Sequence, residues 1–221
     1  MKRPEIAALI AGSGLPEGLK TYLASALRRG RPFSFTAALK KEPAGFVGAV
    51  ARLLAGAAAA LGRPPGEVLF ATGFDGSNLA PHRLEAALAE LLAVLLLREQ
   101  GFSELQLIGT NSGRTADIAA RKDGLRWAFE VRCLSAGGKL DGELLGGKFD
   151  RKLPQARNAM KKYGFDRAAV VLAREPWRFA GFEPDPALAA LAAAARPPGK
   201  RQAAVHLCLA DRGRFGVYPC W

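Results

Sequence analysis

The stretch from residue 109 to residue 135 carries the strongest local folding signal in this chain. Asp123 and Gly124 stand there between two apolar runs, residues 116–120 and 125–134. An Asp-Gly pair tolerates the positive φ angles that a type I′ turn needs, so the pattern predicts a β-hairpin. We expect the rest of the chain to be organised around this hairpin.

The return strand of the hairpin divides its side chains between two faces, because successive residues of a strand point to opposite sides. The first face carries Trp127, Phe129, Val131 and Cys133, and the second carries Arg126, Ala128, Glu130 and Arg132. On the second face Glu130 lies beside Arg132, and Asp117 on the partner strand is placed to converge on them. The hairpin is therefore expected to gather acidic and basic groups at one point.

Composition limits the kind of protein and the kind of partner. The chain has 221 residues, of which 49% are hydrophobic, so it is globular and long enough for one domain with an appendage. Its net charge of +12 indicates a polyanionic partner such as nucleic acid, or alternatively an anionic membrane surface. A third interpretation is that the excess of Arg only reflects a compositional bias, which would leave a basic surface without a function.

Cysteine usage and apolar runs bear on the compartment. The three cysteines show no CxxC pair and no metal-ligand spacing, which is typical of a reducing cytosol. The apolar runs at residues 44–62 and 86–97 are expected to be buried helices, and no secretory signal peptide is recognised. We therefore expect a cytoplasmic protein with no membrane association.

The first part of the chain, residues 1–75, is expected to be a helical extension. Helices are predicted at residues 16–29, 33–41 and 43–61, and a short strand at 67–72. Nothing in this part indicates chemistry, and a helical cap or an oligomerisation surface is the simplest role for it.

The second part, residues 76–221, is expected to be an α/β domain. A long helix at 79–100 precedes a strand at 102–108 and the hairpin, and the glycine pairs at 137–138 and 146–147 are expected to bracket a flexible loop. The remaining expected elements are a cationic helix from 149 or 154 to 163, a buried strand ending at 173, a short helix at 184–195, and a last hairpin at 203–209 and 214–218.

The order of these elements and their acidic residues resembles the PD-(D/E)XK nuclease superfamily, whose fold is called restriction-endonuclease-like. Ala116-Asp117 is followed, after twelve residues, by Glu130-Val131-Arg132, where the family has an acidic residue and then Asp/Glu-x-Lys on the next strand. The resemblance covers about residues 78–173. It implies a helix, three strands, a helix and a strand, in which helices flank a mixed sheet, here with an N-terminal helical extension and a C-terminal β-hairpin.

The resemblance also implies a metal and its ligands. Mg²⁺ or Mn²⁺ would be held by the carboxylates of Asp117 and Glu130 and by the carbonyl of Val131, because hard cations prefer oxygen ligands. Glu85 on the preceding helix would reach the metal directly or through water. Alternatively, Glu85 only stabilises the first turn of its helix by interacting with the helix dipole.

Arg132 is a departure from the family, which has lysine at this place. An arginine keeps its proton at physiological pH and cannot act as a general base, but it can orient water or stabilise the transition state. Lys139 or Lys148 in the following segment could reach the site instead. A further alternative is that cleavage is lost and only nucleic-acid binding remains.

The cationic helix is expected to contact phosphates, which would add affinity without sequence specificity. The candidate nucleic-acid-binding residues are Lys148, Arg151, Lys152, Gln155 and Lys162. The alternative is a solvated helix whose cations have no partner.

The sequence thus predicts a metal-dependent DNA endonuclease of the restriction, repair or defence type. A homodimer is expected on the same hypothesis, because cutting two strands usually takes two sites. The competing hypotheses are an inactive nucleic-acid-binding module and a basic assembly subunit.

Overall fold

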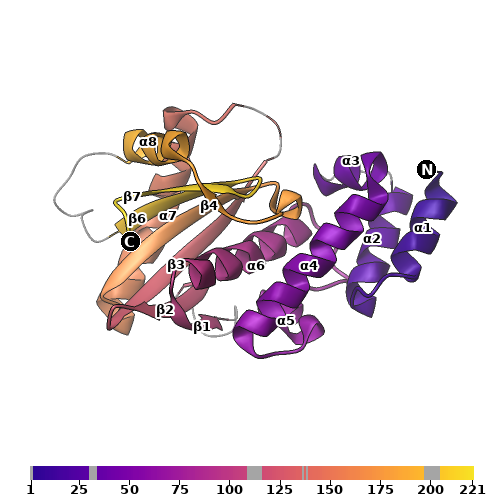
Figure 1. Ribbon diagram of the computed structural model, residues 1–221, viewed down its shortest axis with the longest axis horizontal. Helices are drawn as coiled ribbons and strands as arrows, with labels where there is room; N and C mark the ends of the chain where they lie inside the picture. The colour runs from indigo at the N-terminus through magenta and orange to yellow at the C-terminus, as the bar shows by residue number, and fades with distance from the viewer. Residues whose placement is uncertain (1, 30–33, 109–115, 136, 138, 197–204) are drawn as a thin grey trace.

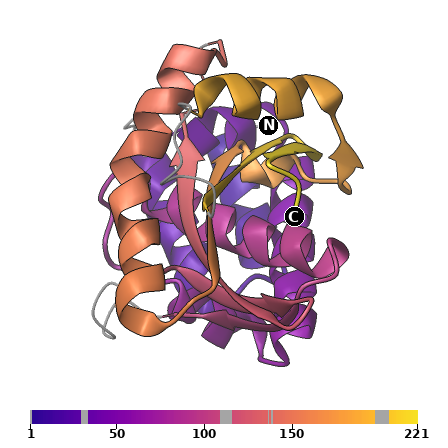
Figure 2. The ribbon, with the colours of Figure 1, turned by 90° about the vertical axis from the view of Figure 1, so that its left-hand side faces the viewer.

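The computed structural model describes residues 2–29, 34–108, 116–135, 137, 139–196 and 205–221. Within these residues the fold is α/β, with seven strands in one mixed sheet and eight α-helices. The helices α7 and α8 cover one face of the sheet and α6 covers the other, while the first five helices lie beyond α6 (Figures 1 and 2).

The sheet has the strand order β1-β2-β3-β4-β6-β7-β5. Its strands are β1 (Ser103–Leu107), β2 (Ile118–Lys122), β3 (Leu125–Leu134), β4 (Arg167–Arg174), β5 (Glu183–Pro184), β6 (Val205–Asp211) and β7 (Arg214–Tyr218). The pairs β1–β2, β2–β3 and β6–β7 are antiparallel, and the pairs β3–β4, β4–β6 and β5–β7 are parallel. The first four strands therefore stand side by side in chain order.

The helices occupy the ranges α1 (Arg3–Ala11), α2 (Glu17–Arg29), α3 (Ser34–Lys41), α4 (Pro43–Leu61), α5 (Pro65–Ala71), α6 (Arg83–Glu99), α7 (Gly142–Tyr163) and α8 (Pro186–Ala195), and a 3₁₀ turn spans Pro176–Arg178. One apolar core joins α1–α6 to one face of the sheet, and a second lies between the other face and α7 and α8. The predicted division at residue 75 stays a prediction, since the first core continues across it.

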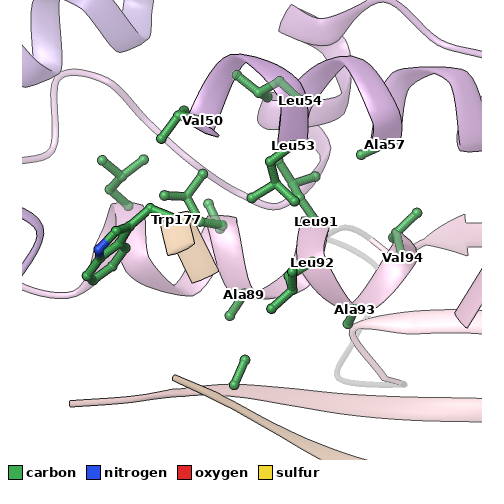
Figure 3. Packing of buried hydrophobic residues seen from close by; sticks show 14 of the residues in the cluster. Val50, Leu53, Leu54, Ala57, Ala89, Leu91, Leu92, Ala93, Val94 and Trp177 are labelled. Atoms are coloured by element: carbon green, nitrogen blue, oxygen red, sulfur yellow. The ribbon is translucent and has the colours of Figure 1, made fainter. Parts of the chain in front are cut away.

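Helix α4 shows how the N-terminal helices attach to the rest. Its buried side chains include Val50, Leu53 and Leu54, and Leu53 points toward Leu91 of α6 (Figure 3). By length and composition alone α4 could cross a membrane. In this fold the same apolar stripe packs in the interior, as expected for a core helix.

The central hairpin is confirmed. Strand β3 has the predicted bounds, and Asp123 and Gly124 take φ angles of 52° and 76°, as a type I′ turn requires. The predicted faces are also confirmed, because Trp127 and Phe129 belong to the core on the α6 side and Ala128 to the core on the α7 side.

The prediction of a strand at residues 67–72 was wrong, because this segment is helix α5. Pro65 stands at the first helical position, where its fixed φ and missing N–H suit a helix. A short apolar run has no periodicity that separates a strand from a buried helix, so the sequence signal was ambiguous. Helix α1, for which no prediction was made, precedes the others.

The prediction of a flexible loop around residues 146–147 was also wrong. These glycines lie inside α7, which begins at Gly142 after Asp141 caps it by accepting a hydrogen bond from the N–H of Leu144 at 2.8 Å. A Cβ atom at Gly146 would lie 3.1 Å from the carbonyl oxygen of Ala195, so glycine here permits close packing against α8.

Helix α6 begins later than predicted, since His82 takes a left-handed φ of 65°.

Candidate active site

Asp117 sits at the point where the pairing of β2 with β3 ends. Its N–H donates to the carbonyl of Phe129 at 3.0 Å, and its carbonyl accepts from the N–H of Ile108 at 2.9 Å. Its side chain then turns to β3, where Oδ2 accepts from the N–H of Val131 at 2.7 Å. The N–H and C=O of one strand residue point to the same side, so the carbonyl of Val131 also faces the side of Asp117.

Glu130 projects from the face of β3 that points away from the α6 core. Its side chain is only 5% exposed. Oε2 of Glu130 accepts a hydrogen bond from Nζ of Lys152 on α7 at 2.8 Å. The same ammonium lies 3.9 Å from Oδ2 of Asp117. Two carboxylates from neighbouring strands therefore share one lysine from the covering helix.

Glu90 on α6 is a further carboxylate whose ionisation is coupled to this pair, and sequence reasoning missed it. Burial, and next the charge of Asp117, raises the pKa of Glu90 well above its usual value, while Lys152 opposes this and Glu130 adds to it. The available signal was an acidic residue in the middle of an otherwise apolar run. Such a residue is costly there unless it has a polar environment.

The pKa values of the other two carboxyls are raised as well. Burial is the main cause for both, and the charge of Asp117 adds to the effect on Glu130. Lys152 opposes the shift in both, and the N–H of Val131 opposes it in Asp117. When Asp117 and Glu130 are both ionised, the single Lys152 ammonium leaves the pair with an excess negative charge, which favours the binding of a further cation.

A hard divalent cation fits this donor set. Among the described residues, no group of three or more His, Cys, Asp or Glu side chains is arranged to hold a metal ion. Mg²⁺, however, keeps several waters and usually takes only one or two carboxylates from the protein. Asp117 and Glu130, with the carbonyl of Val131, match that modest requirement.

Glu85 lies elsewhere on α6. It is 1% exposed, and its charge contributes, after burial, to raising the pKa values of Tyr22 and of Cys133 to about 12. Glu85 therefore faces the N-terminal helices and the far end of β3. Glu90 is the α6 carboxylate whose pKa reflects the charges of Asp117 and Glu130.

The cations predicted for the site fall into two groups. Arg132 is exposed on β3, and Lys139 and Lys148 have no ion pair with any residue that the structure describes. Lys152, expected to contact phosphate, instead reaches the carboxylates with a side chain that is 17% exposed. The signal for this was its position three residues after the buried Phe149, on the inner side of α7.

The other predicted residues of α7 remain available to a ligand. Arg151 and Lys162 are exposed, and Gln155 is half-buried. The Oε1 atom of Gln155 is buried and has no hydrogen-bond partner within the described part of the chain. A buried polar atom without a partner is uncommon and indicates a group that is completed by water, an ion or a ligand.

Comparisons of this chain with models of protein families, with curated proteins and with solved structures found no match.

Proposed function

We propose that this protein is a metal-dependent nuclease that hydrolyses phosphodiester bonds in DNA, on a restriction-endonuclease-like core. The observation that carries the proposal is the convergence of Asp117 and Glu130 from adjacent strands beside the main chain of Val131. The element order α6-β1-β2-β3-α7-β4 supports it, because the family resemblance implies this order. The net charge of +12 supports a polyanionic substrate.

The site's chemistry follows from its donors. A divalent cation at Asp117, Glu130 and the carbonyl of Val131 would supply an activated water and stabilise the charge that develops on the phosphate. The N–H of Val131 holds the Asp117 carboxylate in place, since a hydrogen bond of 2.7 Å fixes its orientation. The site thus has oriented carboxylates before any ligand arrives.

Lys152 takes the role for which the family uses the lysine after the acidic residue. Its ammonium lies beside both carboxylates, whereas the side chain at the family position is the exposed Arg132. Because Lys152 is paired with Glu130, we assign to it a protonated role, in which it orients water and stabilises the transition state. Arg132 would contribute a second fixed cation at the mouth of the site.

Helix α7 would bind the strand on either side of the scissile phosphate. Arg151 and Lys162 offer exposed cations for backbone phosphates, and Lys148 lies one turn before Lys152. The unpaired Oε1 of Gln155, three residues after Lys152, could accept a hydrogen bond from a bound water or a base.

A cleavage assay tests the proposal. Supercoiled plasmid and labelled single strands are incubated with Mg²⁺, Mn²⁺ or EDTA, using the wild type, Asp117→Ala and Glu130→Ala. Cleavage should need the metal and be lost in both variants, while circular dichroism shows that they remain folded. The matched control is Asp150→Ala, which removes an exposed carboxylate from α7 and should leave cleavage unchanged. Cleavage retained by either active-site variant would remove that residue from the mechanism.

The second candidate function is a catalytically inactive nucleic-acid-binding module. The observation that favours it is the ion pair of Lys152, whose ammonium occupies the space between the two carboxylates where a metal would bind. This candidate predicts salt-sensitive DNA binding with no cutting in either metal. If the wild-type protein cuts DNA, that result is enough to exclude this candidate.

A further inference from the structure

A second feature of the fold faces solvent at the β1 edge of the sheet. We call it the Phe70 surface, and it is a hollow of about 480 Å³ lined by Arg63, Gly66, Glu67, Phe70, Ala71 and Leu107. Phe70 is 78% exposed, more than any other large apolar side chain in the described residues. An aromatic ring left so far in water is a candidate contact for a ligand.

The fold itself does not use the Phe70 ring. Helix α5 attaches to the core through Val68 and Leu69, which are 0% and 4% exposed. Phe70 is the next residue on this short helix and points away from that contact. The Phe70 ring is therefore exposed although its helix is well packed through the two neighbouring residues.

Charge beside the ring suits a polyanion. Arg63 is exposed and forms no ion pair with any described residue, so its guanidinium can bind a phosphate. Gly66 also lines the hollow, and a Cβ atom built there would meet nothing within 4 Å. Glu67 is the one acidic group in the lining, and its carboxylate can accept from the amino group of a base.

The Phe70 surface adjoins the strand pair that holds Asp117. Leu107 lines the hollow and pairs in register with Ile118, the residue after Asp117. The next residue, Ile108, donates its N–H to the Asp117 carbonyl at 2.9 Å. Figure 1 shows α5 beside β1 at this edge of the sheet. The carboxylates lie on the α7 side of the sheet and the hollow lies on the α6 side, so a strand bound at the carboxylates would reach Phe70 by passing around β1, the edge strand.

We propose that the Phe70 surface stacks an unpaired base of the nucleic acid whose backbone lies at Asp117 and Glu130. Stacking needs an accessible face of the base, and both faces are covered by neighbours inside a duplex. The substrate class is therefore DNA with a single-stranded segment, such as a flap, gap or free strand. This inference rests on the proposed function, because the proposed function supplies the place at which the nucleic-acid backbone binds.

Binding measurements in EDTA test this surface without any cleavage. Fluorescence anisotropy of a labelled single strand and of its duplex is compared for the wild type, Phe70→Ala, Phe70→Leu and Phe70→Trp. Removing the ring in Phe70→Ala should weaken single-strand binding about 5- to 150-fold, the usual range for loss of one stacked base. Phe70→Leu should be nearly as weak because it lacks a π face, and Phe70→Trp should keep the wild-type affinity.

One control and one charge variant separate stacking from general effects. Leu125→Ala truncates another exposed apolar side chain, at the start of β3, and should leave both affinities unchanged. Arg63→Gln should weaken single-strand binding and reduce its dependence on salt concentration. Duplex affinity should be insensitive to every change at Phe70.

Three results would overturn the inference. Phe70→Ala could bind the single strand as well as the wild type does, or it could lose the same factor for the duplex. In the third case Phe70→Ala changes only the sedimentation of the protein, which would assign the surface to contact between protein chains. By contrast, a wild type that binds single strands through Phe70 but never cuts them counts against the proposed function and not against this surface.

Discussion

Replacing Lys152 by methionine should destabilise the protein strongly, because it removes the cation that pairs with the buried Glu130 and lies near the half-buried Asp117. The side chains of Lys152 and Glu130 are 17% and 5% exposed and meet at 2.8 Å. Removing one partner of a buried pair costs about 3–5 kcal/mol, and the partial exposure of Lys152 places this case near about 3 kcal/mol. For a chain of this size that corresponds to a fall in melting temperature of roughly 6–12 °C.

The loss from Lys152→Met should depend on pH. Burial already raises the pKa of Glu130, and without the ammonium its pKa rises further. The folded state then holds a proton more tightly than the unfolded state, so stability falls as pH rises through the folded-state pKa. The difference between variant and wild type should be largest above neutral pH and small near about pH 4, where Glu130 is protonated.

Thermal unfolding followed by circular dichroism in EDTA measures this difference across pH. The control Lys162→Met removes an exposed cation from the same helix and should change stability by less than about 0.5 kcal/mol. The double variant Lys152→Met with Glu130→Gln should recover much of the lost stability, since the most buried of the carboxylates is then no longer left charged without its partner. A loss below about 1 kcal/mol, or one that is the same at every pH, would refute this electrostatic account.

The other predictions concern single residues. Glu90→Gln should raise the melting temperature in EDTA above neutral pH, because the raised pKa of Glu90 means that its ionised form destabilises the fold; a gain that persists unchanged at low pH would contradict this. Arg132→Lys should keep cleavage, since Lys152 already supplies the ammonium, and complete loss would assign Arg132 a role that needs its guanidinium. Gly216→Ala should cost about 3 kcal/mol in denaturant unfolding, because a Cβ atom would overlap the backbone of Ala189, whereas Gly18→Ala, where a Cβ meets nothing within 4 Å, should be neutral or slightly stabilising.

The parts of the fold that sequence predicted well depend on local chemistry. The turn at Asp123 and Gly124 and the alternation along β3 are fixed by neighbouring residues, so the strand bounds and its two faces could be read directly. The glycines at 146–147 depend on packing against α8, a contact between segments that are far apart in the chain. Their place inside a helix therefore could not be read from propensity alone.

The candidate site divides in the same way. The approach of Asp117 to the Glu130 strand follows from the hairpin and was predicted. Whether Glu85 or Glu90 reaches that pair depends on how α6 is rotated against the sheet, and this is set by packing on its apolar residues. Lys152 turns inward for a similar reason, because the buried stripe through Phe149 and Leu153 fixes the orientation of α7.

The arrangement around Lys152 also bears on whether the ion pair is structural or part of a reactive site. A structural ion pair needs one carboxylate for one ammonium, but here the same lysine acts on Asp117, Glu130 and Glu90. Burial and mutual charge raise the pKa values of all three carboxyls, which costs stability that a core designed only to fold would not lose. One ammonium cannot balance three carboxylates, so its presence does not exclude a divalent cation. The excess of acid over the one ammonium is therefore the feature of this site on which the proposal of a divalent cation rests.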